Sequence, residues 1–357
     1  MKNALQISLF LMLFSIVCTA QTEEKKITWF HTFKEVTIIP NASPDTVLGS
    51  KQWMIFDFAF CEKGILLLTY TKNEKKCALQ LLKDNSELEV IKNEIKEPLA
   101  FYEAAEKSVY LETKAEVFEV SCIGKNIELL PFKKDLFYAM VRTVKGMNSC
   151  AYYMSNWNAH KPEFNYLRID RNSKKVDTIG SIRDQYLYDQ YYSEYTFLAC
   201  KDRWEINRLS RETGINKYDL AARFTGYTHS FWWKPLYSPL FIQKDTVLVF
   251  DHYADQIQKF TCSNELIKNQ KFEFHNKKEY KQVLIQDYFD EVLFALFHKN
   301  GRTTLSKVNT AKGDLDRSYV LFYRYVNKVK VKNGIAYYLY RPYESSQNTF
   351  LYAEVLR

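Results

Sequence analysis

Three segments of the sequence place aromatic rings beside histidine, arginine or asparagine, a combination suited to ligand contact. They are SNWNAHKPEF (155–164), TGYTHSFWWKPLYSP (225–239) and RPYESSQN (341–348). The ligand-binding residues we predict in them are Trp157, Tyr227, His229, Trp232, Trp233, Arg341 and Tyr343, with His160 and Tyr237 beside them. Aromatic rings supply large apolar contact area at little entropic cost, while polar neighbours fix orientation. These segments therefore predict a face that binds a glycan or a peptide.

Two further histidines, His252 and His298, end apolar runs at corresponding places and complete the predicted ligand-binding set. Imidazole is a common metal ligand, but no ligand spacing joins these residues to His229, so we predict neither a metal nor a cofactor. An alternative for Trp232 and Trp233 is structural, because a longer connection leaves a gap that large rings fill. Trp157 lies in a polar loop and is expected to be exposed.

Two acids could support catalysis instead of binding. Asp57 in IFDFAF and Asp287 in LIQDYF are expected on innermost strands. A pair of carboxyl groups at the right separation can perform acid–base chemistry on glycosides, which makes a carbohydrate-active hydrolase or lyase the alternative function. The competing interpretation is a solvated or hydrogen-bonded carboxylate. The sequence contains no GxSxG, HExxH, phosphate-binding loop or EF-hand motif. This argues against several enzyme classes but does not exclude an enzyme, because propeller active sites are assembled from different blades and leave no linear motif. A binding module is the leading expectation.

These segments lie in a chain with a regular repeat. Apolar pairs open the strongest predicted strands at residues 65, 109, 151, 196, 247, 292 and 335, at spacings of 44, 42, 45, 51, 45 and 43. A period in the forties with strand content throughout is typical of β-propeller blades. The sequence therefore predicts an all-β, seven-bladed propeller of four-stranded blades, with six blades as the alternative.

The third and fourth units have the weakest strand patterns. The first strand of the third unit is placed at FYAMVRTV (137–144). The strands of the fourth unit are placed at QYLYDQ (185–190), WEINRLS (204–210) and YDLAARF (218–224), with a turn at RETG (211–214). The seventh unit has only three strands before the chain ends. The N-terminal run FKEVTII (33–39) is predicted to supply the fourth and close the ring, which hides two strand edges.

Strand–turn units such as YLRIDRNSKKVDTIGSI (166–182) and INRLSRETGINKYDL (206–220) resemble repeats of the broad quinoprotein-like and surface-layer-like β-propeller superfamily. The resemblance covers most of residues 50–357 and concerns the fold alone. Neither the tryptophan signatures of quinone-binding blades nor repeated Trp-Asp dipeptides occur. It therefore implies no cofactor and no catalytic residue, because the fold does not determine function.

Residues 1–20 have the features of a signal peptide: Lys2, an apolar stretch from Ala4 to Val17, and small residues before Gln21. We therefore expect one propeller domain over residues 21–357, located in the periplasm, outside the cell or at its surface. Lipidation of Cys18 is the alternative. No later segment is apolar and long enough to span a membrane. An envelope protein is a third expected partner, and the domain would then be a structural component of an envelope complex.

The net charge bears on which partners are expected, and the cysteines bear on whether disulfides form. The net charge of +8 falls to +7 without Lys2, and its lysines lie scattered in predicted turns. Nucleic-acid binding would need basic residues on one face, so no nucleic acid is expected. Six cysteines remain, at 61, 77, 122, 150, 200 and 262, and none forms a CxxC pair. Export permits disulfides, but the sequence leaves any pairing open, and buried apolar thiols are the favoured interpretation.

Overall fold

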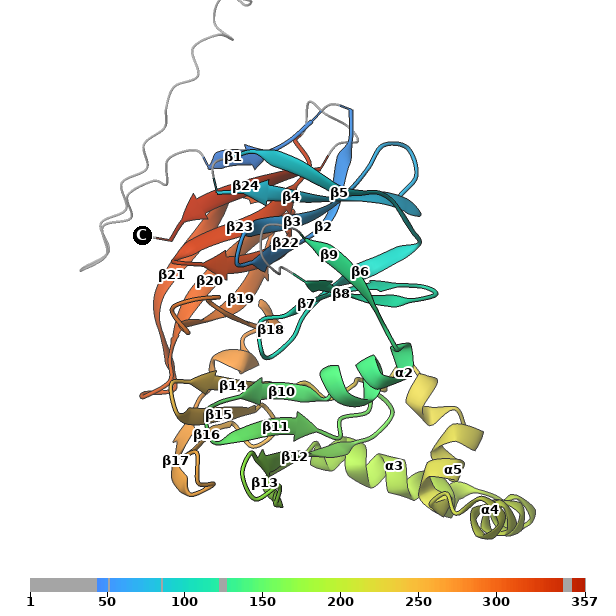
Figure 1. The fold of residues 1–357 in the computed structure, drawn as a ribbon. Helices are drawn as coiled ribbons and strands as arrows, with labels where there is room; N and C mark the ends of the chain where they lie inside the picture. The colour runs from blue at the N-terminus through green and yellow to red at the C-terminus, as the bar shows by residue number, and fades with distance from the viewer. Residues whose placement is uncertain (1–43, 51, 85, 122–126, 343–348, 357) are drawn as a thin grey trace, which may run out of the picture. The chain divides into compact units, whose positions relative to one another are not determined.

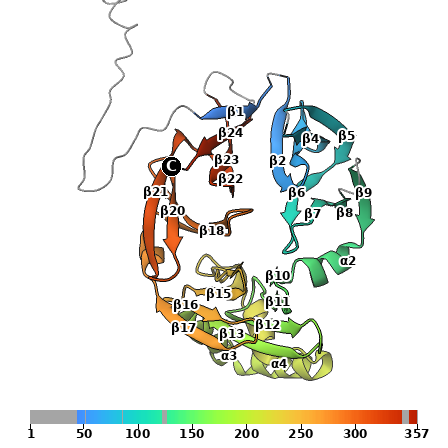
Figure 2. The same ribbon diagram turned by 60° about the vertical axis from the view of Figure 1, so that its left-hand side comes forward.

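The computed structural model describes residues 44–50, 52–84, 86–121, 127–342 and 349–356. These residues form six four-stranded antiparallel sheets, here numbered I to VI along the chain. In residues 44–357 the sheets are arranged around a common centre, with their first strands innermost (Figures 1 and 2). This is a β-propeller fold, and the prediction of an all-β propeller is confirmed.

The strands follow one another around each sheet in chain order. Sheet I contains β2 (Met54–Cys61), β3 (Gly64–Tyr70), β4 (Lys76–Lys83) and β5 (Leu88–Lys96). Sheet II contains β6 (Pro98–Glu103), β7 (Val109–Thr113), β8 (Val117–Ser121) and β9 (Glu128–Phe132). Sheet III contains β10 (Val144–Met147), β11 (Ala151–Ser155), β12 (Glu163–Asp170) and β13 (Val176–Arg183).

The last three sheets repeat this order. Sheet IV contains β14 (Leu240–Gln243), β15 (Thr246–Asp251), β16 (Gln256–Phe260) and β17 (Leu266–Lys271). Sheet V contains β18 (Tyr280–Gln286), β19 (Leu293–Lys299), β20 (Arg302–Asn309) and β21 (Asp314–Arg324). Sheet VI contains β22 (Asn327–Lys332), β23 (Ile335–Tyr340), β24 (Phe350–Val355) and, as its outer strand, β1 (Asp45–Leu48).

An N-terminal strand completes the last sheet, as predicted. β1 pairs antiparallel with β24, placing Asp45 opposite Ala353 and Leu48 opposite Leu351. The predicted run 33–39 lies outside the described residues, so the strand that closes the sheet here is a later one. The pairing covers the ladder groups of β24 that would otherwise be open to another chain.

The expected fourth unit is not a sheet. Residues predicted as its strands form α3 (Gln185–Phe197), α4 (Cys200–Thr213) and α5 (Lys217–Phe224), which lie to one side of the sheets in Figure 1. The described residues thus contain six sheets, one fewer than the seven expected units. The helices belong to the connection from sheet III to sheet IV.

Local chemistry explains the helices. Arg208 forms ion pairs with Glu205 and Glu212, three and four residues away, which is the spacing of helix neighbours. Gly214 adopts φ 70° and donates its N–H to the carbonyl of Ser210, so RETG ends a helix and does not turn between strands. The alternation of apolar and polar residues in WEINRLS predicted a strand with Trp204 on its buried face. In the structure Trp204 lies on α4 and its ring is exposed.

The expected first strand of the third unit is also wrong over most of its length. Residues 134–141 form the short helical turns α2 (Lys134–Leu136) and η1 (Phe137–Val141), and β10 begins only at Val144. Phe137 is fully buried against Ala104, Tyr110 and Val117 of sheet II. Burying that ring on sheet II prevents the same residues from pairing as a strand of sheet III.

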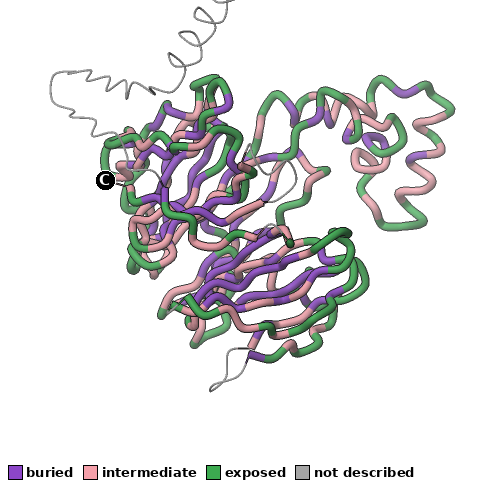
Figure 3. The backbone as a smooth tube through the Cα atoms, turned by 90° about the horizontal axis from the view of Figure 1, so that it is seen from above, coloured by how far each residue is buried: buried purple, intermediate pink, exposed green. Residues whose placement is uncertain are grey.

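The core lies between neighbouring sheets. Shared clusters of buried side chains join sheet I to II, III to IV, IV to V, V to VI and VI to I. Figure 3 shows the buried residues concentrated in the strands, whereas the helices are mostly half-buried or exposed. No helix within the described ranges combines the length and apolarity needed to cross a bilayer.

We predict that replacing Leu351, a fully buried residue of β24, with alanine lowers the free energy of unfolding by about 2 to 5 kcal/mol. Leu351 pairs with Leu48 and packs with Ile55 and Leu339, so the cavity would lie where the ring closes. Urea unfolding followed by tryptophan fluorescence measures the loss. Val355→Ala, at an exposed position of the same strand, should change stability by less than about 0.5 kcal/mol; equal losses would contradict this account.

Candidate functional site

Two loops that are far apart in sequence form one surface at one end of the sheets. In an antiparallel sheet the loop between the second and third strands lies at the same end as the connection to the next sheet. We call this end the top face. Trp157, in the loop after β11, donates its indole N–H to the carbonyl of Leu236 at 2.9 Å. Trp233, in the connection after α5, donates to the carbonyl of Ala159 at 2.7 Å. These reciprocal bonds fasten the two loops together.

Several rings on these fastened loops remain open to solvent. Phe231 is 87% exposed, Trp232 75% and Trp157 44%, and the Phe231 and Trp232 rings lie 5.2 Å apart in an edge arrangement. The rings of His160 and His229 lie 4.9 Å apart and join the same two loops. We call these five residues the aromatic surface. Large exposed rings on hydrogen-bonded loops provide preorganised apolar contact area.

The structure separates the two adjacent tryptophans. Trp233 is only 8% exposed and packs against Tyr191 and Tyr227. It therefore fills the space under the long connection, the structural role considered for both rings, whereas Trp232 faces outward. Tyr227 is half-buried beside Trp233 and supports the surface from below. Phe231 was missed, although it stands next to Trp232 in the sequence.

His252 follows β15 at the top-face end of sheet IV, but it is buried in a cluster of rings that includes Tyr237, Phe272 and Tyr280. Its Nδ1 lies 3.0 Å from the carbonyl of Phe250, and its Nε2 lies 3.1 Å from the hydroxyl of Tyr280. Because a carbonyl only accepts, Nδ1 carries the proton and Nε2 accepts from Tyr280. Burial lowers the pKa of His252 to about 4, so the ring is neutral at pH 7. With both nitrogens engaged, His252 has a packing role.

Tyr237 belongs to the same cluster and not to the aromatic surface. Its ring lies 5.0 Å from that of His252, and its hydroxyl accepts the N–H of Leu284 at 2.8 Å. Among the described residues there is no group of three or more side chains arranged to bind a metal ion. His229 and His252 thus sit in different surroundings, the first exposed and the second buried.

His298 lies in a separate groove of about 460 Å³ between sheets V and VI. The groove has apolar walls that include Ile285 and Leu296, and its edge carries Lys281 and Lys328.

Arg341 is exposed just after β23. Tyr343 lies outside the described residues. The structure therefore gathers only some of the predicted residues on the aromatic surface.

Asp57 is a buried acceptor of hydrogen bonds from backbone N–H groups. One carboxylate oxygen accepts from Phe58 at 3.0 Å and the other from Phe101 at 2.9 Å, which links sheets I and II. Its Oδ1 also lies 3.6 Å from Nζ of Lys328. Both oxygens are thus engaged, in agreement with the hydrogen-bonded interpretation of this acid.

Asp287 has a similar role in a different place. It follows β18, and its carboxylate accepts N–H groups of Phe289 and Asp290 in its own turn. It also accepts N–H groups of Asn333 at 3.0 Å and Gly334 at 2.7 Å from sheet VI. Asp287 therefore ties sheet V to sheet VI at the end opposite the top face, whereas Asp57 lies within a first strand.

Alternate lysines of β22 point toward acids and rings of the first two sheets. Lys330 lies 2.7 Å from Glu103, and Lys328 reaches Asp57. Lys332 stands 5.4 Å from the ring centre of Phe60. The sequence NKVKVK shows this alternation, and strand period alone places the three lysines on one face. The central carboxylates are accordingly paired with cations.

Comparisons with known proteins identify no family. No protein-family model matches the chain, and no curated protein matches it. Among solved structures, a luciferin-regenerating enzyme aligns with TM-score 0.39 and 9% identity, covering 87% of this chain and 93% of the other. Virginiamycin B lyase from Staphylococcus aureus aligns with TM-score 0.33 and 8% identity, over 81% and 78%. Regucalcin from Agrobacterium tumefaciens, described as calcium-binding, aligns with TM-score 0.36 and 8% identity, over 88% and 93%.

We predict that Asp287→Asn destabilises the protein by about 1 to 3 kcal/mol. Asparagine keeps one oxygen, and its amide nitrogen accepts no hydrogen bond. Either the Gly334 N–H on Oδ2 or the N–H groups on Oδ1, which include that of Asn333, would therefore lose their acceptor. Urea unfolding measures the change. Asp290→Asn is the matched control, because that side chain is exposed in the same turn. A fully stable Asp287→Asn protein would show that the tie between sheets V and VI is dispensable.

We also predict that stability falls on acidification below the ordinary pKa of histidine. The pKa of His252 is depressed in the folded state, so between about pH 6.5 and 4 the unfolded chain binds the extra proton. The contribution of neutral His252 to the free energy of unfolding is at its maximum above pH 6.5. It is smaller by about 2 kcal/mol at pH 5. Urea unfolding at pH 7 and pH 5 measures the difference. His252→Gln should remove most of this dependence; an unchanged pH slope in that variant would refute it.

Proposed function

We propose that this chain is a binding module that recognises a glycan on its top face. The observation that carries the proposal is the exposure of Trp232 and Trp157 on two loops that are fastened by indole hydrogen bonds. Covering an exposed ring with another apolar surface removes apolar area from water, which is favourable, and contiguous exposed apolar groups mark interaction sites. Loops that are already ordered lose less entropy on binding.

The surroundings of the rings favour a neutral, hydroxyl-rich ligand. Asn156 and Asn158 lie on either side of Trp157 and are exposed, and His160 and His229 stand nearby. The amide oxygens of Asn156 and Asn158 already accept backbone N–H groups within the loop. Amide N–H and imidazole groups can bond a ligand without requiring a charged partner. A sugar ring offers an apolar face for the indole and hydroxyls for these groups. This combination is the reason for placing a glycan first.

A peptide is the second candidate, because Phe231 is the most exposed ring of the surface and has no polar edge. An apolar peptide side chain would cover it as a protein interface covers an aromatic anchor. The same surface would then dock an envelope protein, and the chain would act as a structural component. Binding measurements on both ligand classes distinguish these functions.

The hydrolase or lyase alternative has weaker support. The carboxylate oxygens of Asp57 and Asp287 all accept backbone N–H groups. Asp57 lies within β2, whereas Asp287 follows β18 in the turn at the opposite end from the top face. A catalytic pair needs two carboxyl groups facing one bond of the substrate. Turnover of a polysaccharide that survives Asp57→Asn together with Asp287→Asn would rule out this mechanism.

We further propose that the protein is exported to the periplasm, the medium or the cell surface. The support is the signal-like segment 1–20, which lies outside the described residues. Lipid attachment at Cys18 would keep the protein on a membrane, and soluble export is the preferred outcome because Val17 precedes that cysteine. Fractionation of cells with N-terminal sequencing of the mature chain tests both.

We predict that Trp232→Ala weakens binding to the glycan identified on an array by about 10-fold or more, since stacking of a sugar ring on the indole is lost without any change in the core. Calorimetry with the purified glycan, and with a library peptide in parallel, gives the affinity. Trp204→Ala is the matched control, because that ring is 62% exposed on α4 outside the aromatic surface.

The outcomes of this comparison are distinct. Loss of glycan binding in Trp232→Ala but not Trp204→Ala supports the proposal. Loss of peptide binding with the same pattern assigns the surface to a peptide. Equal binding by all three proteins, or no binding by the unmodified protein, overturns the assignment of this surface.

A further inference from the structure

Two cysteines from neighbouring sheets lie together at the end opposite the top face. Cys150 precedes β11 in the turn between the first two strands of sheet III, and Cys262 follows β16 in the turn between the last two strands of sheet IV. Both are half-buried. They are 112 residues apart (262 minus 150), so only the packing of the two sheets brings them together.

Arg168 of β12 holds the backbone beside Cys262 in position. Its guanidinium is largely buried and donates through Nε to the carbonyl of Cys262 at 2.8 Å. The same group donates to Asp170 at 2.7 Å, and the next residue, Arg171, donates its N–H to the carbonyl of Cys150 at 2.9 Å. One strand end therefore holds the main chain of both cysteines.

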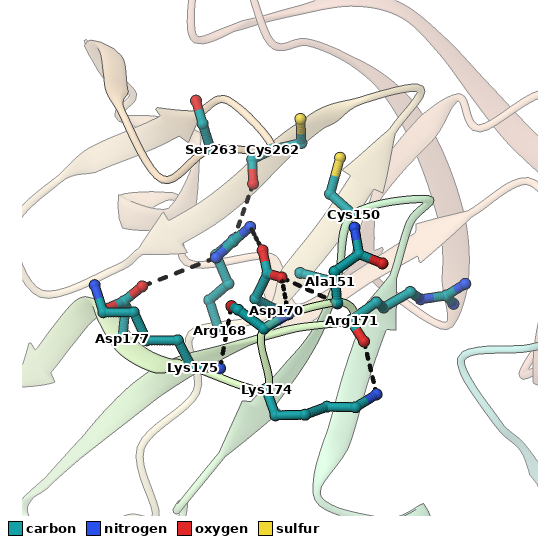
Figure 4. Close-up of polar contacts among 12 residues, drawn as sticks. Cys150, Ala151, Arg168, Asp170, Arg171, Lys174, Lys175, Asp177, Cys262 and Ser263 are labelled. Atoms are coloured by element: carbon teal, nitrogen blue, oxygen red, sulfur yellow. Dashed lines mark hydrogen bonds and ion pairs between the residues drawn. The ribbon is translucent and has the colours of Figure 1, made fainter.

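The two side chains extend into the same space. Figure 4 shows both sulfur atoms above the Arg168–Asp170 pair, with Cys150 and Cys262 approaching from adjacent sheets. Interaction with the Cys150 thiol, followed by partial burial, raises the pKa of the Cys262 thiol, in agreement with this proximity. Disulfides form between cysteines whose backbones already lie at bonding separation with converging side chains.

We infer that Cys150 and Cys262 form a disulfide bond that fastens sheet III to sheet IV. The inference stands apart from the proposed ligand, because the cysteines lie at the other end of the sheets from the aromatic surface. The bond closes a loop that contains α3, α4, α5 and all five residues of that surface. A crosslink of this length strongly restricts the unfolded chain.

The reaction requires a disulfide oxidant such as glutathione disulfide. The thiolate of one cysteine attacks the oxidant, which forms a mixed disulfide and releases one glutathione thiolate. The thiolate of the second cysteine then attacks the protein sulfur of that mixed disulfide and releases the second glutathione. The two protein thiols lose two electrons and two protons, and the oxidant becomes two thiols.

The other described cysteines provide controls. Cys61 and Cys77 are buried, and burial raises the pKa of the Cys77 thiol to about 12, which disfavours exchange. Cys200 is exposed on α4. A thiol that reacts by exposure alone would therefore be Cys200, whereas a thiol that reacts by proximity would be one of the proposed pair.

The test uses the full mature chain, equilibrated folded in a glutathione redox buffer, alkylated and digested without reduction. We expect a crosslinked peptide that joins Cys150 to Cys262, with Cys200 alkylated. The oxidised protein should melt about 5 °C or more above the protein kept in dithiothreitol. Cys150→Ser and Cys262→Ser should each abolish that difference, and Cys200→Ser should keep it.

Recovery of both Cys150 and Cys262 in alkylated form after oxidation would overturn the inference, as would a crosslink from either to another cysteine. The peptide analysis needs only the unmodified protein, so it decides the question even if a serine variant does not fold.

Discussion

The pairing of β1 with β24 is the interaction on which the arrangement of the sheets depends. Each sheet buries its faces against its neighbours, so the first and last sheets must meet to cover theirs. The cluster around Leu351 does this, joining strands from residues 45–61 to strands from residues 335–355. Backbone hydrogen bonds to β1 at the same time satisfy the outer edge of sheet VI, which would otherwise pair with another chain.

Once the ring is closed, the connections on the top face can vary without disturbing the core. The connection from sheet I to sheet II is a single residue, Glu97, whereas that from sheet III to sheet IV holds three helices. The cost of lengthening a surface loop grows slowly with its length. The buried Trp233 anchors the long connection on sheet III, and this leaves Trp232 and Phe231 free to face outward.

The centre and the opposite end of the sheets serve stability. Asp57 joins sheets I and II, Asp287 joins sheets V and VI, and Lys330 reaches Glu103 across from β22. Buried carboxylates are tolerated there because backbone N–H groups and lysines compensate for lost hydration. The contacts that join these sheets therefore lie away from the exposed rings of the top face.

Much of this architecture follows from the sequence alone. Strands of period two, a repeat in the forties and a missing last strand predicted a propeller closed from the N-terminus, since alternation and edge pairing are local properties of strands. The helices within residues 185–224 were missed although their signals are local: opposite charges stand three and four residues apart, and a glycine ends α4. Tertiary structure decided the burial of Phe137 on sheet II, which prevents residues 137–141 from joining sheet III.

The same division holds for the candidate site. The sequence predicted the two loops, because their rings and polar residues stand together along the chain. It did not separate Trp232 from Trp233, remove His252 from the surface or bring Cys150 to Cys262. Those outcomes depend on which sheets pack together and which hydrogen bonds cross between them, and no local pattern of side chains contains that information.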